Sequence, residues 1–340
     1  MSTADRYRAA GVDLDAAERT KRRIVESLAS TKTVLAHGQT GAFGGMIRLP
    51  ADVVQPTLVM STDGVGTKVL VAIRAGRHDT VGQDLVNHCV NDILVHGARP
   101  LAFLDYIAAA DIEVETIAVL VEGVARGCRD HEMTLVGGET AQLPELYQPG
   151  HYDLAGTIVG VVSEKKALHG DHVRQGDALV GYASSGLHTN GYTLARMIVF
   201  DELKLVVDSE VADLNMTVAD ALLAVHRSYW HAVAPALPHI HALAHITGGG
   251  IPGNLRRSLP LGRRAELERG AWKVPALFSW LEDAGGVSRE EMFNVFNMGL
   301  GMIAIVPPDG VAEVRDTAAR AGVETWEIGE VVAGQGVQIH

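Results

Sequence analysis

Eight residues between two regular patterns combine the side chains that a polar-ligand loop needs. The stretch Ser184-Ser185-Gly186-Leu187-His188-Thr189-Asn190-Gly191 contains hydroxyls, glycines, an imidazole and an amide. The apolar run 178–183 before it predicts a buried strand, and residues 192–199 after it predict a helix. Free backbone N–H groups at the start of a helix suit a phosphate or a carboxylate. The alternative is an ordinary glycine-rich turn capped by Ser or Asn.

A second stretch with chemical potential, Ser61-Thr62-Asp63-Gly64-Val65-Gly66-Thr67-Lys68, begins where the apolar run 57–61 ends. It supplies a carboxylate, two glycines, a hydroxyl and a lysine, which are the components of a metal–phosphate site. It is not a Walker loop, because the Gly-Lys-Ser/Thr order and spacing are absent. The loop Gly41-Ala42-Phe43-Gly44-Gly45 is also flexible, although it is equally consistent with a tight turn.

The helix predicted over residues 81–97 has an unusual polar face. At about 100° per residue its apolar side chains fall on one broad arc. The opposite arc carries Asp84, Asn87, His88, Asn91 and Asp92. A solvated helix face usually carries Lys, Arg and Glu, so these short side chains favour a ligand or metal held close to the backbone. An exposed face of unusual composition is the alternative.

Three carboxylates are candidate ligands of Mg²⁺, which prefers hard oxygen atoms and phosphate. Asp63 and Asp92 belong to the stretches above, and Glu139 follows the apolar run 133–136 within Gly137-Gly138-Glu139-Thr140. Taken singly, each Asp could instead be a helix cap or a turn residue.

Composition limits the classes of protein to consider. The chain has 340 residues, a formal net charge of -12 and 47% hydrophobic residues, and it lacks a basic run, so nucleic acid is not an expected partner. The first 35 residues do not resemble a secretory signal, and no run approaches the roughly 20 apolar residues of a membrane span. Cys89 and Cys128 lie in apolar patterns, which favours free buried thiols. A cytoplasmic protein is expected.

Alternating strand and helix patterns position these loops in two halves. Strands are predicted over 57–61, 101–107 and 154–162, with helices over 81–96 and 114–128 between them. A charged stretch at 163–177 interrupts the pattern. Beyond it, the sequence predicts a helix near 218–233 and strands over 242–246 and 300–306. An α+β fold follows, with a domain boundary expected at 166/167.

Motifs along nearly the whole chain resemble the phosphoribosylformylglycinamidine cyclo-ligase, or aminoimidazole ribonucleotide synthetase, family. Besides the stretches above, the resemblance rests on these segments: Tyr7-Arg8-Ala9-Ala10-Gly11-Val12-Asp13, Gly97-Ala98-Arg99-Pro100-Leu101, Phe103-Leu104-Asp105-Tyr106, His245-Ile246-Thr247-Gly248-Gly249-Gly250 and 291–302. The first-half motifs are shared more loosely with kinases of the same superfamily, and the second-half motifs single out the cyclo-ligases.

The resemblance implies ATP-driven closure of formylglycinamidine ribonucleotide to aminoimidazole ribonucleotide, with release of ADP and phosphate. It implies Mg²⁺ on Asp63, Asp92 and Glu139, and catalytic roles for Lys68, His188 and His245. The implied ATP-binding residues are Gly41, Phe43, Gly44, Gly45, Asp63, Gly64, Gly66, Thr67, Lys68, Asp84 and Asn91. The implied substrate-binding residues are Ser184, Ser185, Gly186, His188, Asn190, Thr247, Gly248, Gly249, Gly250 and Asn297.

The resemblance also implies a two-domain synthetase fold. Residues 1–166 would bind ATP and Mg²⁺ and dimerise, and residues 167–340 would bind the substrate. The sheets of two copies would join into a barrel-like core, so a homodimer is expected. An open sheet with apolar residues on alternating faces, as at Leu58-Val59-Met60, also needs a cover.

Two departures from the family pattern stand out. Val225-His226 occupies the place where the family commonly has a Pro-Thr pair before Arg227, and Gln142 stands where a Glu is common. Two other functions remain open from the sequence. A superfamily kinase would phosphorylate a stable acceptor, and a non-catalytic nucleotide-binding subunit would tolerate loss of Asp63, Lys68, Asp92 and Glu139.

Overall fold

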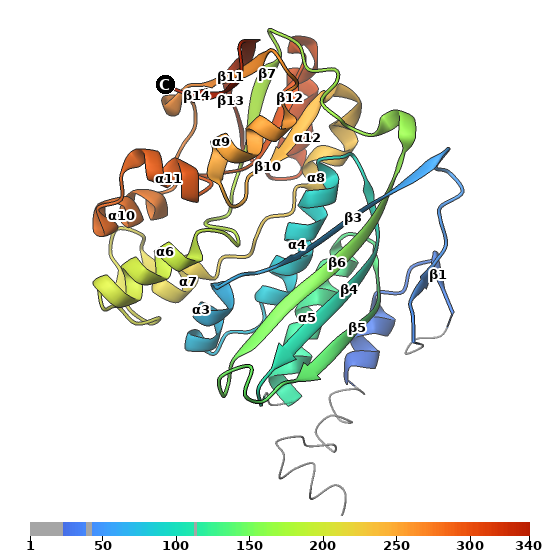
Figure 1. Cartoon of the computed structure of the whole chain (residues 1–340), viewed down its shortest axis with the longest axis vertical. Helices are drawn as coiled ribbons and strands as arrows, with labels where there is room; N and C mark the ends of the chain where they lie inside the picture. Colours follow the sequence, from blue (N-terminus) through green and yellow to red (C-terminus); the bar gives the residue numbers. More distant parts are fainter. Residues whose placement is uncertain (1–22, 39–42, 112–113) are drawn as a thin grey trace, which may run out of the picture.

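Two separate β-sheets, one in each half of the chain, form the framework of the protein (Figure 1). The computed structural model describes residues 23–38, 43–111 and 114–340. The Tyr7–Asp13 motif and Gly41 lie outside these residues. Each half therefore builds its own layer, as the alternating pattern predicts for an α+β chain.

The first half contains a four-stranded sheet in the order β3-β6-β4-β5. Its strands are β3 (Pro56–Gly64), β4 (Arg99–Ala109), β5 (Thr134–Gln142) and β6 (Tyr152–Ser163). Strand β6 pairs antiparallel with β3 and β4, whereas β4 and β5 are parallel. Helices α4 (Val81–Leu94) and α5 (Val114–Asp130) pack together beside this sheet. The smaller elements are β1 (Ala36–His37), β2 (Met46–Ile47) and α3 (Lys68–Ala75).

The second half contains a six-stranded sheet in the order β10-β12-β7-β13-β11-β14. Its strands are β7 (Ala178–Ala183), β10 (Ala242–His245), β11 (Arg263–Leu267), β12 (Leu300–Val306), β13 (Thr325–Ala333) and β14 (Gly336–Ile339). Its α-helices are α6 (Tyr192–Arg196), α7 (Val218–Leu222), α8 (Trp230–Val233), α9 (Gly250–Leu255), α10 (Ala276–Gly285), α11 (Arg289–Val295) and α12 (Val311–Arg320). A short hairpin joins β8 (Glu210–Val211) and β9 (Met216–Thr217).

The main predicted strands and the two first-half helices are confirmed. The helix predicted over 218–233 is wrong, because it breaks into α7 and α8 around an irregular segment, residues 223–229. Glu139 was expected after a strand, but it lies inside β5, which continues to Gln142. The helix after the 184–191 loop continues from α6 into a π-helical turn, Met197–Glu202.

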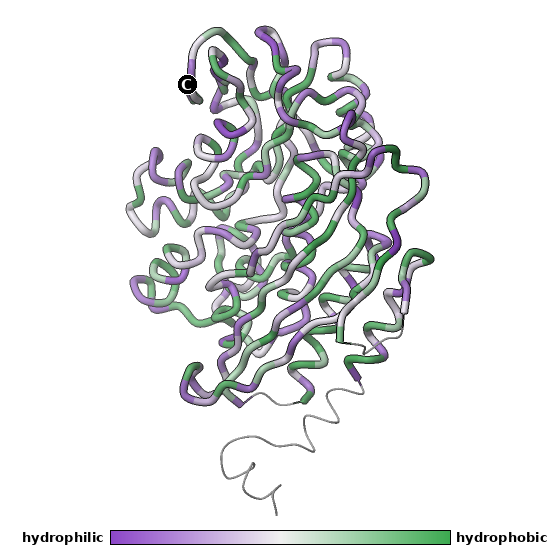
Figure 2. The backbone as a smooth tube through the Cα atoms, turned by 45° about the vertical axis from the view of Figure 1, so that its right-hand side comes forward, coloured by the Kyte–Doolittle hydropathy of each residue, from purple (hydrophilic) through white to green (hydrophobic). Residues whose placement is uncertain are grey.

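The first-half sheet has an apolar outer face. Large side chains on that face are strongly exposed: Leu58 43%, Met60 61%, Leu104 37% and Tyr106 40%. Figure 2 shows hydrophobic stretches along these strands. Isolated exposed apolar residues are ordinary, but a group on one sheet face marks an interaction surface.

Both cysteines are buried and free, as expected from the apolar patterns. Among the described residues, no helix has the length and hydropathy required to cross a membrane.

Candidate active site

The polar face of α4 points at the second half of the chain, where residues 223–229 cross it. The backbone N–H of His226 donates to Asp84 Oδ1 at 2.6 Å, and that of Tyr229 donates to Asn91 Oδ1 at 2.9 Å. Asn87 Nδ2 donates to the carbonyl of His226 at 2.7 Å. Three of the five short side chains that favoured a ligand, those of Asp84, Asn87 and Asn91, instead bind the backbone of residues 223–229. In this structure Asp84 and Asn91, which were expected to bind ATP, join the two halves.

The side chain of Lys68 is also buried and makes its contacts inside the protein. Its ammonium lies 2.7 Å from Asp84 Oδ2, donates to the carbonyl of Ala224 at 2.7 Å, and is completely buried. Burial lowers the pKa of Lys68 and raises the pKa of Asp84, and each is opposed by the other's charge. The expectation that Lys68 contacts phosphates does not fit this placement, because an ammonium without solvent access cannot reach a ligand in the cleft.

A cleft of about 520 Å³ lies between the two halves and gathers several of the predicted residues. The first half contributes Asp63, at the end of β3, and Asp92, near the end of α4. The second half contributes His245, at the end of β10, and Thr247 after it. Gly64 ends β3, and Gly66 and Thr67 lie in the connection to α3, where Gly66 has a left-handed backbone (φ 56°).

The two aspartates of the cleft are held by histidines. Asp63 Oδ2 lies 2.7 Å from His88 Nε2, and Asp92 Oδ1 lies 2.9 Å from His245 Nδ1. Ser61 Oγ donates to Asp92 Oδ2 at 2.9 Å. Burial raises the pKa of each carboxyl, but the hydrogen bonds and charges of the histidines outweigh it, so the pKa of each lies below its usual value. Both side chains are therefore carboxylates at neutral pH.

These two carboxylates fit a magnesium ion, whereas Glu139 cannot join them within one chain. Asp63, His88 and Asp92 each offer a ligand atom, and the three atoms lie within 4.8 Å of one another. The sheet order puts Glu139 three strands away from Asp63, about 14 Å at ordinary strand spacing. In the strand register, Glu139 of β5 lies beside Tyr106 of β4, whose side chain is exposed. Asp63 of β3 is in register, across β6, with Asp105 of β4, whose side chain is buried.

The glycine loop at 41–45 is likewise separated from Asp63. Of its described residues, Phe43 is fully exposed and Gly44 has open space around it. Gly45 packs on β5, where an added Cβ would lie 2.4 Å from Val136 Cβ. Strand β5 is the edge of the sheet opposite to β3. This loop and the Asp63–Lys68 segment therefore do not form one phosphate site within a single chain.

The 184–191 loop is largely held by hydrogen bonds to other parts of the second half. Ser184 Oγ lies 3.1 Å from Asn297 Oδ1, and Asn297 Nδ2 donates to the carbonyl of Gly186 at 2.8 Å. Ser185 Oγ donates to the carbonyl of Val225 at 2.5 Å. Asn297 is only 4% exposed. The expectation that Asn297 reads the substrate is therefore not supported, because its amide shapes this loop instead.

His188 and Asn190 of the same loop retain unused polar atoms. His188 Nε2 accepts the backbone N–H of Ser185 at 3.2 Å, while its Nδ1 is buried without a partner among the described residues. Asn190 Nδ2 is likewise buried without a hydrogen-bond partner among the described residues. His188 is 1% exposed and does not line the cleft. In this placement His188 is connected to the cleft only through neighbouring rings.

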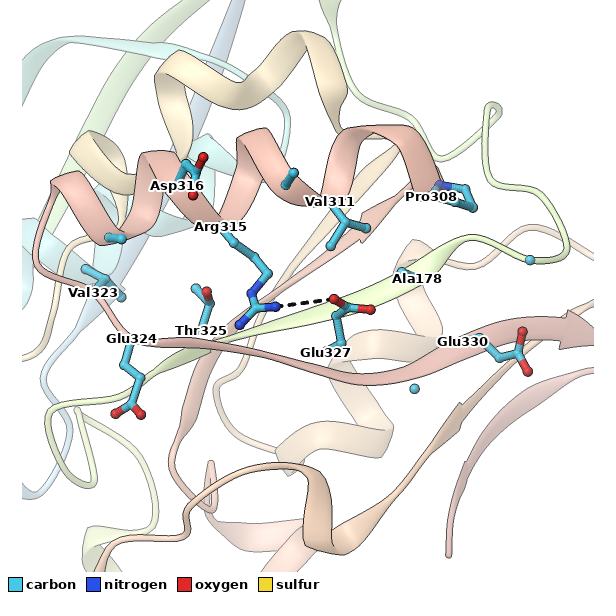
Figure 3. Close-up of a pocket in the computed structure, with 14 residues that line it drawn as sticks. Ala178, Pro308, Val311, Arg315, Asp316, Val323, Glu324, Thr325, Glu327 and Glu330 are labelled. Carbon is cyan, nitrogen blue, oxygen red and sulfur yellow. Dashed lines mark hydrogen bonds and ion pairs between the residues drawn. The ribbon is translucent and has the colours of Figure 1, made fainter.

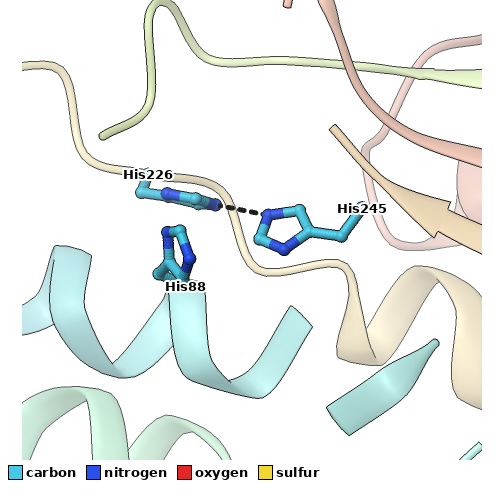
Figure 4. Close-up of side chains that lie close together, drawn as sticks. All are labelled: His88, His226 and His245. Atoms are coloured by element: carbon cyan, nitrogen blue, oxygen red, sulfur yellow. Dashed lines mark hydrogen bonds between the residues drawn. The ribbon is translucent and has the colours of Figure 1, made fainter. Parts of the chain in front are cut away.

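Those rings include two histidines that were not predicted to be catalytic (Figure 4). His226 stacks on His188, with ring centroids 4.0 Å apart, and its Nε2 lies 3.3 Å from His245 Nε2. His88 lies between Asp63 and Thr189 Oγ1, which is 2.8 Å from its Nδ1. His88 could have been found from its place on the polar arc of the helix. His226 had only the departure from the Pro-Thr pair as a signal.

The pKa values of the four rings differ with their partners. Burial lowers the pKa of His88, but Asp63 and Asp92 outweigh it and the net shift is upward. Burial lowers the pKa of His245 by more than Asp92 raises it. Burial and the neighbouring cations lower the pKa of His188 and His226 far below the usual value. His245 Nδ1 faces Asp92, and His245 Nε2 lies 3.3 Å from His226 Nε2.

The glycine run after β10 has special backbone conformations. Gly249 and Gly250 have φ values of 92° and 62°, and a Cβ on Gly250 would lie 1.9 Å from the carbonyl oxygen of Phe293. Asn254 Nδ2 donates to the carbonyl of Gly250 at 2.8 Å. Gly248 remains exposed. This turn positions Thr247 at the cleft.

A larger hollow, about 850 Å³, lies between α12 and β13 (Figure 3). Arg315 and Glu327 form an ion pair across it at 3.3 Å. None of the predicted site residues lines it.

The fold and cleft place the chain in a defined class. Residues 48–162 match the family model for the N-terminal domain of AIR synthase related proteins, and residues 174–340 match the model for their C-terminal domain. Among solved structures, the thiamine-monophosphate kinase of Stenotrophomonas maltophilia K279a is similar (TM-score 0.69, 16% identity, covering 93% of this chain and 95% of that chain). E. coli HypE is also similar (TM-score 0.65, 17% identity, 95% and 93% covered). At these identities the likeness concerns the fold alone.

Closer relatives narrow the class to one family. The phosphoribosylformylglycinamidine cyclo-ligase of Myxococcus xanthus (strain DK1622) is 47% identical over 333 residues, 97% of this chain and 96% of that protein. The enzyme of the same name from Desulfatibacillum aliphaticivorans is 45% identical over 336 residues, 98% and 97% of the two chains. The chain belongs to the phosphoribosylformylglycinamidine cyclo-ligase family, and is thus a ligase of purine biosynthesis.

Proposed function

We propose that this protein closes the imidazole ring of aminoimidazole ribonucleotide at the cleft between its halves. The substrates are formylglycinamidine ribonucleotide and ATP, and the products are aminoimidazole ribonucleotide, ADP and phosphate. The cleft of about 520 Å³ carries this proposal, because it combines two ionised aspartates with polar groups of the second half. Family membership supports the same reaction.

The reaction needs ATP because an amide oxygen is a poor leaving group. Transfer of the γ-phosphoryl group to the formyl oxygen makes the adjacent carbon reactive. The neighbouring amidine nitrogen then attacks this carbon, and phosphate leaves with the oxygen. Catalysis of this kind depends mainly on positioning and on charge stabilisation.

Asp63 and Asp92 would hold Mg²⁺, which neutralises phosphate charge when it is bound. His88 and His245 act as positioning residues, since each hydrogen-bonds one of these carboxylates. Polar groups of the substrate would bind to Thr247, Gly248 and the unpaired amide nitrogen of Asn190. Asn190 lies beside Gly248, since its Oδ1 would be 3.4 Å from a Cβ added to that glycine.

A homodimer would complete the nucleotide site. The exposed Leu58, Met60, Leu104 and Tyr106 give the first-half sheet a surface suited to a second copy. The glycine loop and Glu139 belong to the edge strand opposite to Asp63. In a dimer, the glycine loop of the partner subunit and the partner's Glu139 would lie close to Asp63. The free cysteines agree with a reducing compartment, and we place the enzyme in the cytoplasm.

The test is an assay of the purified chain with ATP, Mg²⁺ and formylglycinamidine ribonucleotide. The expected result is equal amounts of ADP and aminoimidazole ribonucleotide. A stable phosphorylated product would instead support a superfamily kinase. Binding of ATP with neither product would support a non-catalytic subunit.

A further inference from the structure

The cleft between the halves has a basic region as well as the two aspartates. His96, His169 and Arg257 line the same cleft as Asp63 and Asp92. All three side chains are exposed. In the described part of the chain, none of the three makes an ion pair or a side-chain hydrogen bond. Their donors are therefore available to a ligand in the cleft.

Backbone contacts hold the three basic side chains on one stretch of the cleft wall. The carbonyl of His96 accepts the N–H of the residue that precedes His169 at 3.2 Å. Gly170, which follows His169, packs against Ser258, because an added Cβ would lie 2.9 Å from the Ser258 carbonyl oxygen. His169 is thus fixed between a residue bonded to His96 and a residue in contact with the neighbour of Arg257.

This basic region lies apart from the aspartates on both walls of the cleft. On the wall of the first half, His96 follows Asp92 by four residues, in the turn that ends α4. On the other wall, Ser258 Oγ donates to the carbonyl of Leu243 at 2.7 Å, two residues before His245 in β10. Two residues of a strand span about 7 Å. Since His245 holds Asp92, the cleft has an acidic end and a basic end.

The two ends suit different phosphate groups. Carboxylates repel a phosphate unless a metal ion lies between them, so the acidic end suits the Mg²⁺-bound phosphates of ATP. A guanidinium binds phosphate through charge-assisted hydrogen bonds, often two in parallel. An imidazole offers an N–H donor in either protonation state. Local donors are needed because Asp and Glu outnumber Lys and Arg by 41 to 29, so the field of the whole chain repels anions.

We propose that Arg257, together with His96 and His169, forms the subsite for the 5′-phosphate of the ribonucleotide substrate. The assignment rests on the proposed function, in which the substrate is formylglycinamidine ribonucleotide. Its phosphate and its formyl group lie on opposite sides of the ribose, so the substrate spans the cleft. The formyl oxygen then faces the Mg²⁺ end, where the γ-phosphoryl group of ATP is transferred. The subsite also selects a nucleotide over a nucleoside.

Steady-state kinetics of Arg257→Gln tests this subsite. Loss of the charged hydrogen bonds should raise the KM for formylglycinamidine ribonucleotide by about 10–100-fold. The KM for ATP should not change. His169→Asn should raise the first KM by a smaller factor. Arg256→Gln is the matched control and should behave like the unaltered chain, because Arg256 is exposed on the same turn but does not line the cleft.

Ribose 5-phosphate tests the subsite without the reaction. At millimolar concentration, in the absence of ATP and Mg²⁺, it should raise the melting temperature of the unaltered chain and of Arg256→Gln. Ribose, which lacks the phosphate, should not. In Arg257→Gln the increase should disappear. The melting temperature of this variant without ligand should equal that of the unaltered chain, since the side chain of Arg257 is exposed.

Three results would overturn the subsite. One is an unchanged KM for formylglycinamidine ribonucleotide in Arg257→Gln. Another is a raised KM for ATP in its place, which would assign the guanidinium to the nucleotide. The third is a melting temperature that ribose 5-phosphate changes equally in Arg257→Gln and the unaltered chain, or in neither. A chain that binds ribose 5-phosphate through Arg257 but forms no aminoimidazole ribonucleotide would contradict the proposed function and leave the subsite standing.

Discussion

The ammonium of Lys68 and the carboxylate of Asp84 form a completely buried ion pair at 2.7 Å, at the junction of the two halves. Removing one member of such a pair leaves an unpaired buried charge, which typically costs about 3–5 kcal/mol. Lys68→Met should therefore reduce the free energy of unfolding by this order, as measured by urea denaturation. The double variant Lys68→Met/Asp84→Asn should recover much of the loss, since Asn can still accept the N–H of His226. A stable single variant with weakened ATP binding would instead restore Lys68 to the phosphate site.

The cleft carboxylates should matter for turnover more than for folding. Asp63 and Asp92 have side chains 45% and 24% exposed, so Asn at either position should leave the fold intact. Removing an anionic ligand of Mg²⁺ should lower kcat by at least about 100-fold, the scale of one lost electrostatic contact in a transition state. The measurement is kcat over a Mg²⁺ titration, with the exposed Asp208→Asn as control. Near-normal activity at saturating Mg²⁺ would remove both residues from the metal site.

The limits of sequence analysis are clearest at residues 223–229. The strands and the helix pair of the first half could be predicted, because their apolar periods are long and their burial follows from them. The helix predicted over 218–233 failed because side chains of α4 take its backbone N–H groups: Asp84 binds that of His226, and Asn91 binds that of Tyr229. Local periodicity contains no information about such a distant competitor.

Long-range packing also decides which site residues could be predicted from the sequence. Asp63, Asp92, His245 and Thr247 were predicted and do meet at one cleft. Lys68 and Asn297 have residue types that suit ligands equally well, but their burial is set by long-range packing. Gly138 illustrates the reverse case, since an added Cβ there would lie 2.0 Å from Asp105 Oδ1. A glycine that resembled part of a ligand loop makes room for a neighbouring carboxyl group.

The two predicted histidines should differ in their effects. His245 lines the cleft and hydrogen-bonds Asp92, whereas His188 is buried behind His226. We expect His245→Asn to lower kcat more strongly than His188→Asn. Neither variant should alter the Kd for ATP by more than a few-fold, measured by isothermal titration. A larger kinetic loss in His188→Asn would mean that the loop carrying it moves toward the substrate during turnover.

The outer face of the first-half sheet should govern association. Sedimentation of the unaltered chain at micromolar concentration should give twice the mass of one chain. Met60→Glu places a charge on this apolar face, where Met60 is 61% exposed in one chain, and should shift the mass toward the monomer without unfolding it. Glu is tolerated on an open face but is costly when buried without a partner. A fully active monomer of the unaltered chain would contradict the proposed dimer.

Asp105 should make the stability of the protein depend on pH. Burial raises the pKa of this carboxyl group to about 7, and the side chain packs over Gly138 of the neighbouring strand. Since the pKa in the folded state lies above the unfolded value, the contribution to stability is fully present below about pH 4 and is lost as pH rises through 7. The rise from the ordinary aspartate pKa to about 7 corresponds to about 4 kcal/mol. Asp105→Asn removes this titration, so its stability relative to the unaltered chain should increase between pH 5 and pH 8. Parallel urea midpoints for the two chains over that range would show instead that Asp105 is ionised in the fold.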